Sequence, residues 1–116
     1  MGLRDRYLYH YEHIFFITTT CNKWLSLLTI GSCFEIITES MEFCCKKYDA
    51  NILGYALMPN HIHLILHFQD GIKRIAFMRD FKKFTSVKIR QEIEVHSPEM
   101  IVNIRHNRKG QVFKVW

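Results

Sequence analysis

Two histidines separated by one apolar residue are the side chains in this sequence best placed to do chemistry. His61 and His63 follow Pro59-Asn60, a pair typical of a turn, and they open an apolar run that ends at Phe68. In a β-strand, residues i and i+2 face the same way, so the two imidazoles would project side by side. Neutral ring nitrogens are common metal ligands, so the spacing indicates a site at which both rings share one ion. The alternative is a pair of packed or surface histidines.

Three further side chains have a chemical role and a more ordinary alternative. His67 would share the strand face of His61 and His63; we expect it to be exposed at the strand end, and a third metal ligand is the alternative. For Phe16 and Trp24 we expect packing, with stacking on a nucleic-acid base as the alternative.

Length and composition indicate one globular domain over residues 1–116, with 48% hydrophobic residues and a net charge of +5. The basic balance favours a polyanionic partner. No apolar run is long enough to cross a membrane. The four cysteines form no C-x-x-C pair, so we expect reduced, mostly buried thiols in a cytoplasmic protein; they are Cys21, Cys33, Cys44 and Cys45.

Hydrophobic periodicity predicts the elements that position the histidines. Strands are expected over 13–20, 52–58 and 61–68, with helices over 33–48 and 72–95. Ser32 and Glu35 fit a capping box at the start of the first helix. Further strands are expected over 101–104 and 112–116, joined by 106–110. The order β-α-β-β-α-β predicts an α+β, ferredoxin-like fold, with an antiparallel sheet and two helices on one face.

The apolar pattern also predicts how the elements pack. Strand 61–68 is expected to be central, with both faces covered, because apolar residues lie on both sides of it. The second helix carries two apolar stripes. Phe77, Phe81 and Phe84 make one stripe, and a second stripe on another side needs a further partner; its members are Ile75, Met78, Ile89 and Ile93.

Residues 55–66 read Tyr-Ala-Leu-Met-Pro-Asn-His-Ile-His-Leu-Ile-Leu, and this segment resembles the signature of the IS200-like, or REP-associated, tyrosine transposases. Segments 15–19 and 78–86 resemble the first strand and the following helix of that family. The resemblance extends over about residues 10–116. It implies that His61 and His63 hold Mg²⁺ or Mn²⁺ against a phosphate of single-stranded or hairpin DNA. It also implies that a tyrosine after the histidine pair attacks the phosphate and forms a phosphotyrosine.

The sequence departs from the family at the nucleophile. Its tyrosines are Tyr7, Tyr9, Tyr11, Tyr48 and Tyr55, and none follows the histidine pair. We therefore assign no catalytic nucleophile and no third metal ligand, and we expect a domain truncated before the tyrosine-bearing helix. The first alternative is a non-catalytic relic that binds DNA hairpins. The second is a histidine-triad-like nucleotide hydrolase, although Ile65 occupies the position of the third histidine.

Basic residues after the histidine pair are the expected DNA contacts, with solvated helix and loop positions as the alternative. The expected contacts are Lys82, Lys83, Lys88, Arg105, Arg108 and Lys109. An apolar stripe without a partner also allows a homodimer.

Overall fold

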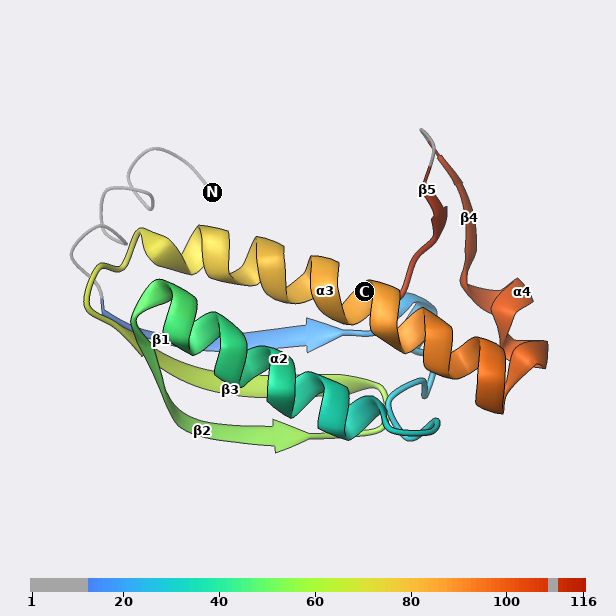
Figure 1. Cartoon of the computed structure of the whole chain (residues 1–116), viewed down its shortest axis with the longest axis horizontal. Helices are drawn as coiled ribbons and strands as arrows, with labels where there is room; N and C mark the ends of the chain where they lie inside the picture. Colours follow the sequence, from blue (N-terminus) through green and yellow to red (C-terminus); the bar gives the residue numbers. More distant parts are fainter. Residues whose placement is uncertain (1–12, 109–110) are drawn as a thin grey trace.

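A three-stranded antiparallel sheet forms the centre of the computed structural model, which describes residues 13–108 and 111–116. Its strands are β1 (Ile14–Thr20), β2 (Ala50–Leu57) and β3 (His61–Phe68), in the spatial order β1-β3-β2 (Figure 1). The strand that carries the histidine pair is therefore central, as the sequence predicts. The close turn at Pro59-Asn60 makes β2 and β3 antiparallel neighbours.

Two helices cover one face of the sheet: α2 (Cys33–Tyr48) and α3 (Lys73–His96). The even-numbered residues of β3 from Ile62 to Phe68 face them and are fully buried, and the Phe68 ring meets the Phe77 ring of α3 edge-on at 5.5 Å. The α+β class and the two helices on one face are thus confirmed. The prediction that both faces of 61–68 are covered is wrong, because His63 is exposed on the other side.

Helix α2 presents its predicted apolar stripe to this core, and Ile37, Met41 and Cys44 are buried. The expected capping box is not formed. Ser32 occupies the N-cap position, but its side chain makes no capping hydrogen bond. The backbone of Ser32, at φ −97° and ψ 30°, lies outside the extended conformation from which a capping hydroxyl reaches the next turn.

Helix α3 buries parts of both of its apolar stripes. Phe77 and Phe81 join the core, and so do Ile89 and Ile93 of the second stripe. A separate partner for the whole second stripe is therefore not needed, because the same core includes Ile104 from the chain that follows. Within the described ranges, no helix is both long and apolar enough to span a bilayer.

The region after α3 differs most from the sequence prediction. A 3-10 turn, η2 (Pro98–Met100), leads into the short helix α4 (Ile101–Ile104), so the strand expected over 101–104 is wrong. β4 (Arg105–Arg108) and β5 (Gln111–Phe113) then pair with each other as a separate hairpin that stands away from the main sheet (Figure 1). The strand expected over 112–116 is therefore shorter, and in the described part of the chain no fourth strand joins the sheet.

The last residues return to the core. The Lys114 N–H donates to the Ile104 carbonyl at 2.8 Å, and the Asn22 N–H donates to the Val115 carbonyl at 2.7 Å. The indole N–H of Trp116 donates at 2.9 Å to the hydroxyl of Thr85, a buried residue of α3. These contacts hold the base of the hairpin against α3 and against the segment after β1.

A polar cluster ties the end of α2 to α3. The Tyr48 hydroxyl donates to the Asp80 carboxylate, and the Lys47 ammonium lies 2.9 Å from the same oxygen. Arg79 Nε donates to the other carboxylate oxygen at 3.2 Å. These donors favour the ionised form, and the hydrogen bond from Tyr48 contributes most, so the pKa of Asp80 lies well below its usual range.

This cluster predicts a pH-dependent effect of Tyr48→Phe on stability. A carboxylate whose pKa is lowered by folding stabilises the protein above its unfolded pKa of about 3.9, and it loses that effect as the pH falls further. We expect the variant to be less stable than the parent at pH 7, and the difference to shrink only as the pH falls through the Asp80 pKa of the variant towards the lower Asp80 pKa of the parent. Urea unfolding at pH 7 and pH 2 measures this difference, with Tyr55→Phe as the exposed control. An equal loss at both pH values would contradict the prediction.

Candidate functional site

The histidine pair lies at the beginning of β3, on the face that the helices leave open. Its residues alternate with the buried Ile62 and Leu64, so the covered face of β3 directs His61 and His63 to the opposite side. Thr20 and Thr18 of β1 are their respective cross-strand neighbours. His63 is exposed, and His61 is half-buried. The pair is therefore accessible to a ligand approaching the open face.

The two rings are close and their orientations are fixed by hydrogen bonds. Their centroids are 4.8 Å apart and their planes are nearly perpendicular, at 86°. Nδ1 of His61 is 2.7 Å from the amide oxygen of Asn60, and Nδ1 of His63 is 3.0 Å from the Thr18 hydroxyl. Because an amide oxygen only accepts, His61 carries its proton on Nδ1 and presents an unprotonated Nε2 when neutral.

This arrangement suits two ligands of one metal ion. Histidine ligands usually hold the metal with one nitrogen while the other is hydrogen-bonded to a neighbouring group, which fixes the tautomer. The two ring centroids are 4.8 Å apart on the same face of the sheet, close enough for both imidazoles to hold one ion.

Among the described side chains, no third imidazole lies near the pair. His67 shares the open face but pairs with Ile14 at the other end of β1, and its ring lies 6.2 Å from that of His13. Across residues 13–108 and 111–116, no three histidine, cysteine, aspartate or glutamate side chains are grouped as a metal site would need.

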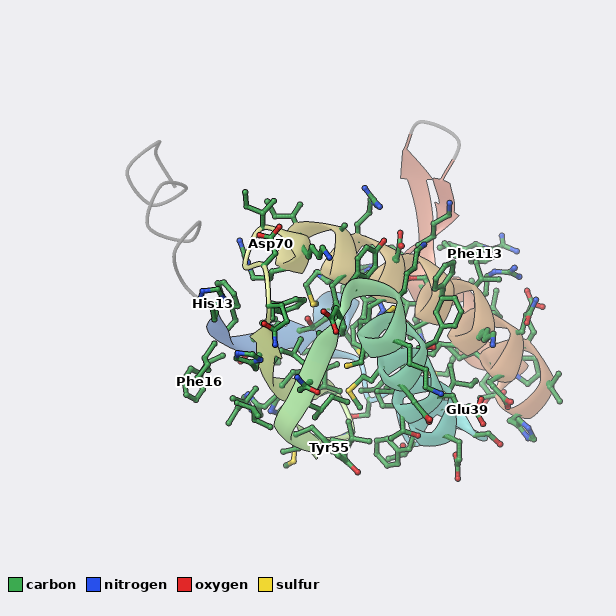
Figure 2. All side chains as sticks on the ribbon, turned by 60° about the vertical axis from the view of Figure 1, so that its left-hand side comes forward. His13, Phe16, Glu39, Tyr55, Asp70 and Phe113 are labelled. Atoms are coloured by element: carbon green, nitrogen blue, oxygen red, sulfur yellow. The ribbon has the colours of Figure 1, made fainter. Side chains whose placement is uncertain are left out.

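The described tyrosines lie away from the histidines. Tyr48 binds Asp80 within the helix layer. Tyr55 pairs with Leu64, so it belongs to the helix-covered face, and it projects beside α2 (Figure 2). Tyr7, Tyr9 and Tyr11 lie outside the described residues.

The cysteines do not supply a nucleophile in place of tyrosine. None forms a disulfide within the described ranges, and three of the four are buried, as the sequence predicts. Burial raises the pKa of the Cys21 thiol to about 11, and burial together with nearby carboxylates raises that of Cys33 to about 12. Burial likewise raises the pKa of Cys44 to about 11. These thiols are protonated at neutral pH and are poor nucleophiles.

The predicted DNA-contacting residues fall into two groups. Lys82, Lys83 and Lys88 are exposed on α3, so they belong to the layer on the other side of the sheet from the histidines. Arg105 is exposed at the start of β4. Arg108 ends β4, but its side chain and the whole of Lys109 lie outside the described part of the chain.

Arg105 and the base of the β4–β5 hairpin lie at the end of the molecule that carries His61 and His63. The Cys21 N–H donates to the Asn60 carbonyl at 2.9 Å, and the next residue, Asn22, bonds Val115 just after the hairpin. The fold therefore brings Arg105 and the base of the hairpin to the end of the sheet where β3 begins. It does not bring the α3 lysines to that face.

Two partners of the imidazoles were not predicted from the sequence. Asn60 precedes His61 directly, so an asparagine next to a candidate ligand was a usable signal. Thr18 is 45 residues from His63, and only the register between β1 and β3 brings them together. Its position in a run of three threonines gave no such indication.

The chain thus has an antiparallel sheet with helices on one face and a histidine pair on the other. It belongs to the IS200-like transposase family, because the family model described as "Transposase IS200 like" matches residues 7–108. No curated protein matches the sequence.

Two solved structures share the fold. One is a REP-associated tyrosine transposase bound to a REP hairpin, with a TM-score of 0.57 and 19% identity over 66% of this chain. The other is a candidate transposase from Deinococcus radiodurans R1, with a TM-score of 0.58 and 12% identity over 78% of this chain. The matches cover 46% and 65% of those two proteins, respectively.

Proposed function

We propose that this chain is a DNA-binding transposase domain that engages single-stranded or hairpin DNA through a divalent ion held by His61 and His63. The observation that carries the proposal is the geometry of the pair, with ring centroids 4.8 Å apart and both Nδ1 atoms hydrogen-bonded. The hairpin in the related transposase structure supports a hairpin partner for this chain as well.

The residues at the site fit a divalent ion. Asn60 and Thr18 hydrogen-bond Nδ1 of the two rings, which leaves Nε2 as the nitrogen that each ring would present to an ion. Imidazole ligands suit Mn²⁺ better than Mg²⁺, which prefers oxygen. When bound, such an ion polarises a phosphoryl oxygen and aligns the DNA backbone. Other ligands would come from the DNA or from water.

The basic residues supply the general attraction for DNA. The chain carries a net charge of +5. We propose that Arg105, Arg108 and Lys109 contact phosphates near the histidine pair, and that Lys82, Lys83 and Lys88 contact DNA that continues past α3. Neutralised phosphates release counterions, so binding should weaken steeply as the salt concentration rises.

A second candidate function is hairpin recognition without strand cleavage. Among the described residues, no tyrosine lies on the histidine face, and no third ligand group completes the pair. On this reading the domain binds and positions DNA but forms no phosphotyrosine of its own. A homodimer remains a prediction.

The test measures DNA binding and covalent attachment together. We expect a fluorescent hairpin with a single-stranded flank to bind at low salt and to bind more tightly when Mn²⁺ is added. Denaturing gels should show no protein–DNA adduct if the described tyrosines are not nucleophiles. An adduct that maps to Tyr7, Tyr9 or Tyr11 would favour the cleaving enzyme over the recognition domain. No binding at low salt, with or without Mn²⁺, would contradict both candidates.

A further inference from the structure

The open face of the sheet carries an exposed phenylalanine next to the histidine pair. Phe16 of β1 is 80% exposed, so the expectation that it packs is wrong. It projects away from the helices (Figure 2). Two residues further along the same strand face is Thr18, which bonds His63. Residues i and i+2 of a strand are about 6.8 Å apart, so Phe16 is the next outward position from the pair along β1.

Phe16 stands at one end of a row of three residues that crosses the open face of the sheet. Across the sheet its partner is Ile65, which is half-buried, and the partner of Ile65 on the far side is Gly54. Gly54 has no side chain, and a Cβ placed there would meet only the tip of Ile65, at 3.6 Å. The side chains therefore decrease in size along the row Phe16-Ile65-Gly54, here called the shelf. The shelf is an apolar surface with an aromatic ring at one edge.

The charge of this face favours a polyanion over another protein surface. β1, β2 and β3 contain no aspartate or glutamate, and β3 contributes three histidines. The acidic side chains of Glu35, Glu39 and Glu42 lie on α2, in the helix layer. A chain of phosphates can therefore cross the open face without meeting a carboxylate from any of the three strands, which would repel it.

We infer that the shelf binds one unpaired nucleobase by stacking it on Phe16, beside the phosphate that approaches His61 and His63. The inference rests on the proposed function and deepens it, because it assigns a base-binding position next to the metal-binding position. Every base has a π-face, so the shelf accepts any base but only from a single strand. In a duplex the same face of the base is already stacked on its neighbours.

The experiment combines a protein variant with a DNA lesion. Single-stranded oligonucleotides that carry one abasic site at successive positions are titrated against the parent and Phe16→Leu by fluorescence anisotropy. The parent should lose roughly tenfold in affinity when the abasic site falls at one position, as expected for one stacked base. Phe16→Leu should bind the intact strand about as weakly as the parent binds that abasic strand. An abasic site at the same position should cause no further loss of affinity in this variant. Phe16→Trp should restore the dependence.

The matched control is Phe43→Leu, a change of the same type at a phenylalanine that is 55% exposed on α2. It should bind and respond to abasic sites as the parent does, and thermal unfolding checks that both variants fold. Equal binding by Phe16→Leu and the parent, with Mn²⁺ dependence intact, would overturn the shelf and leave the proposed function standing. If the parent is a dimer and Phe16→Leu is a monomer with unchanged DNA affinity, the base-binding inference is wrong. The shelf would then bind a second copy of this chain. No binding by any variant would overturn both proposals.

Discussion

Replacing His61 and His63 with alanine should lower the affinity for Mn²⁺ by at least about a hundredfold, because mutation of groups that merely support metal ligands already costs about 10–100-fold. Both rings face the open side of β3, and their Nδ1 atoms are hydrogen-bonded to neighbours. The double variant removes every described imidazole at that end of the strand. Electron paramagnetic resonance titration of free Mn²⁺ measures the loss without any need for catalysis.

Three further variants make this test specific. His67→Ala removes an imidazole from the same face at the far end of β3, and it should leave Mn²⁺ affinity unchanged. Thr18→Val and Asn60→Ala remove the partners of Nδ1, and each should weaken binding by about 10–100-fold. A loss of affinity in His67→Ala equal to that of the double variant would contradict a two-histidine site.

Leu64→Ala should have the largest effect on folding, with the free energy of unfolding falling by about 2–5 kcal/mol. Leu64 is 1% exposed and lies between the central strand and the helices, where a deleted side chain leaves a cavity. Ile65→Ala is the matched change one residue later, on the open face. It should cost roughly 1 kcal/mol, because Ile65 is only partly removed from water.

Urea unfolding of both variants measures the asymmetry between the two faces of β3. Circular dichroism should show the same secondary structure as the parent before unfolding begins. Equal losses for Leu64→Ala and Ile65→Ala would contradict a strand that is covered on one side only. They would indicate that another surface packs on the open face in solution.

The sequence was sufficient to locate the elements that bear the site. His61, His63 and His67 alternate with residues that become buried, and the period of two put the histidines on one face. The apolar repeats of α2 and α3 predicted their extents to within a residue at each end. These features depend on local periodicity, which a single sequence displays directly.

Features that depend on tertiary partners were not predictable. The run Ile14-Phe15-Phe16-Ile17 has no alternation, so nothing in it distinguishes the buried Phe15 from the exposed Phe16. Which of the two is buried depends only on the face of the sheet that the two helices cover. Residues 101–104 have strong β propensity, yet they continue the turn begun at Pro98 as a helix that buries Ile104.

The indole of Trp116 docked on Thr85 gives the molecule a built-in optical reporter. The only other tryptophan, Trp24, is 69% exposed, so an aqueous quencher such as iodide would extinguish its emission first. The remaining fluorescence would then come from Trp116, which holds the segment after the β4–β5 hairpin against α3. Detachment of that segment would be visible as a red shift, separately from events at the sheet.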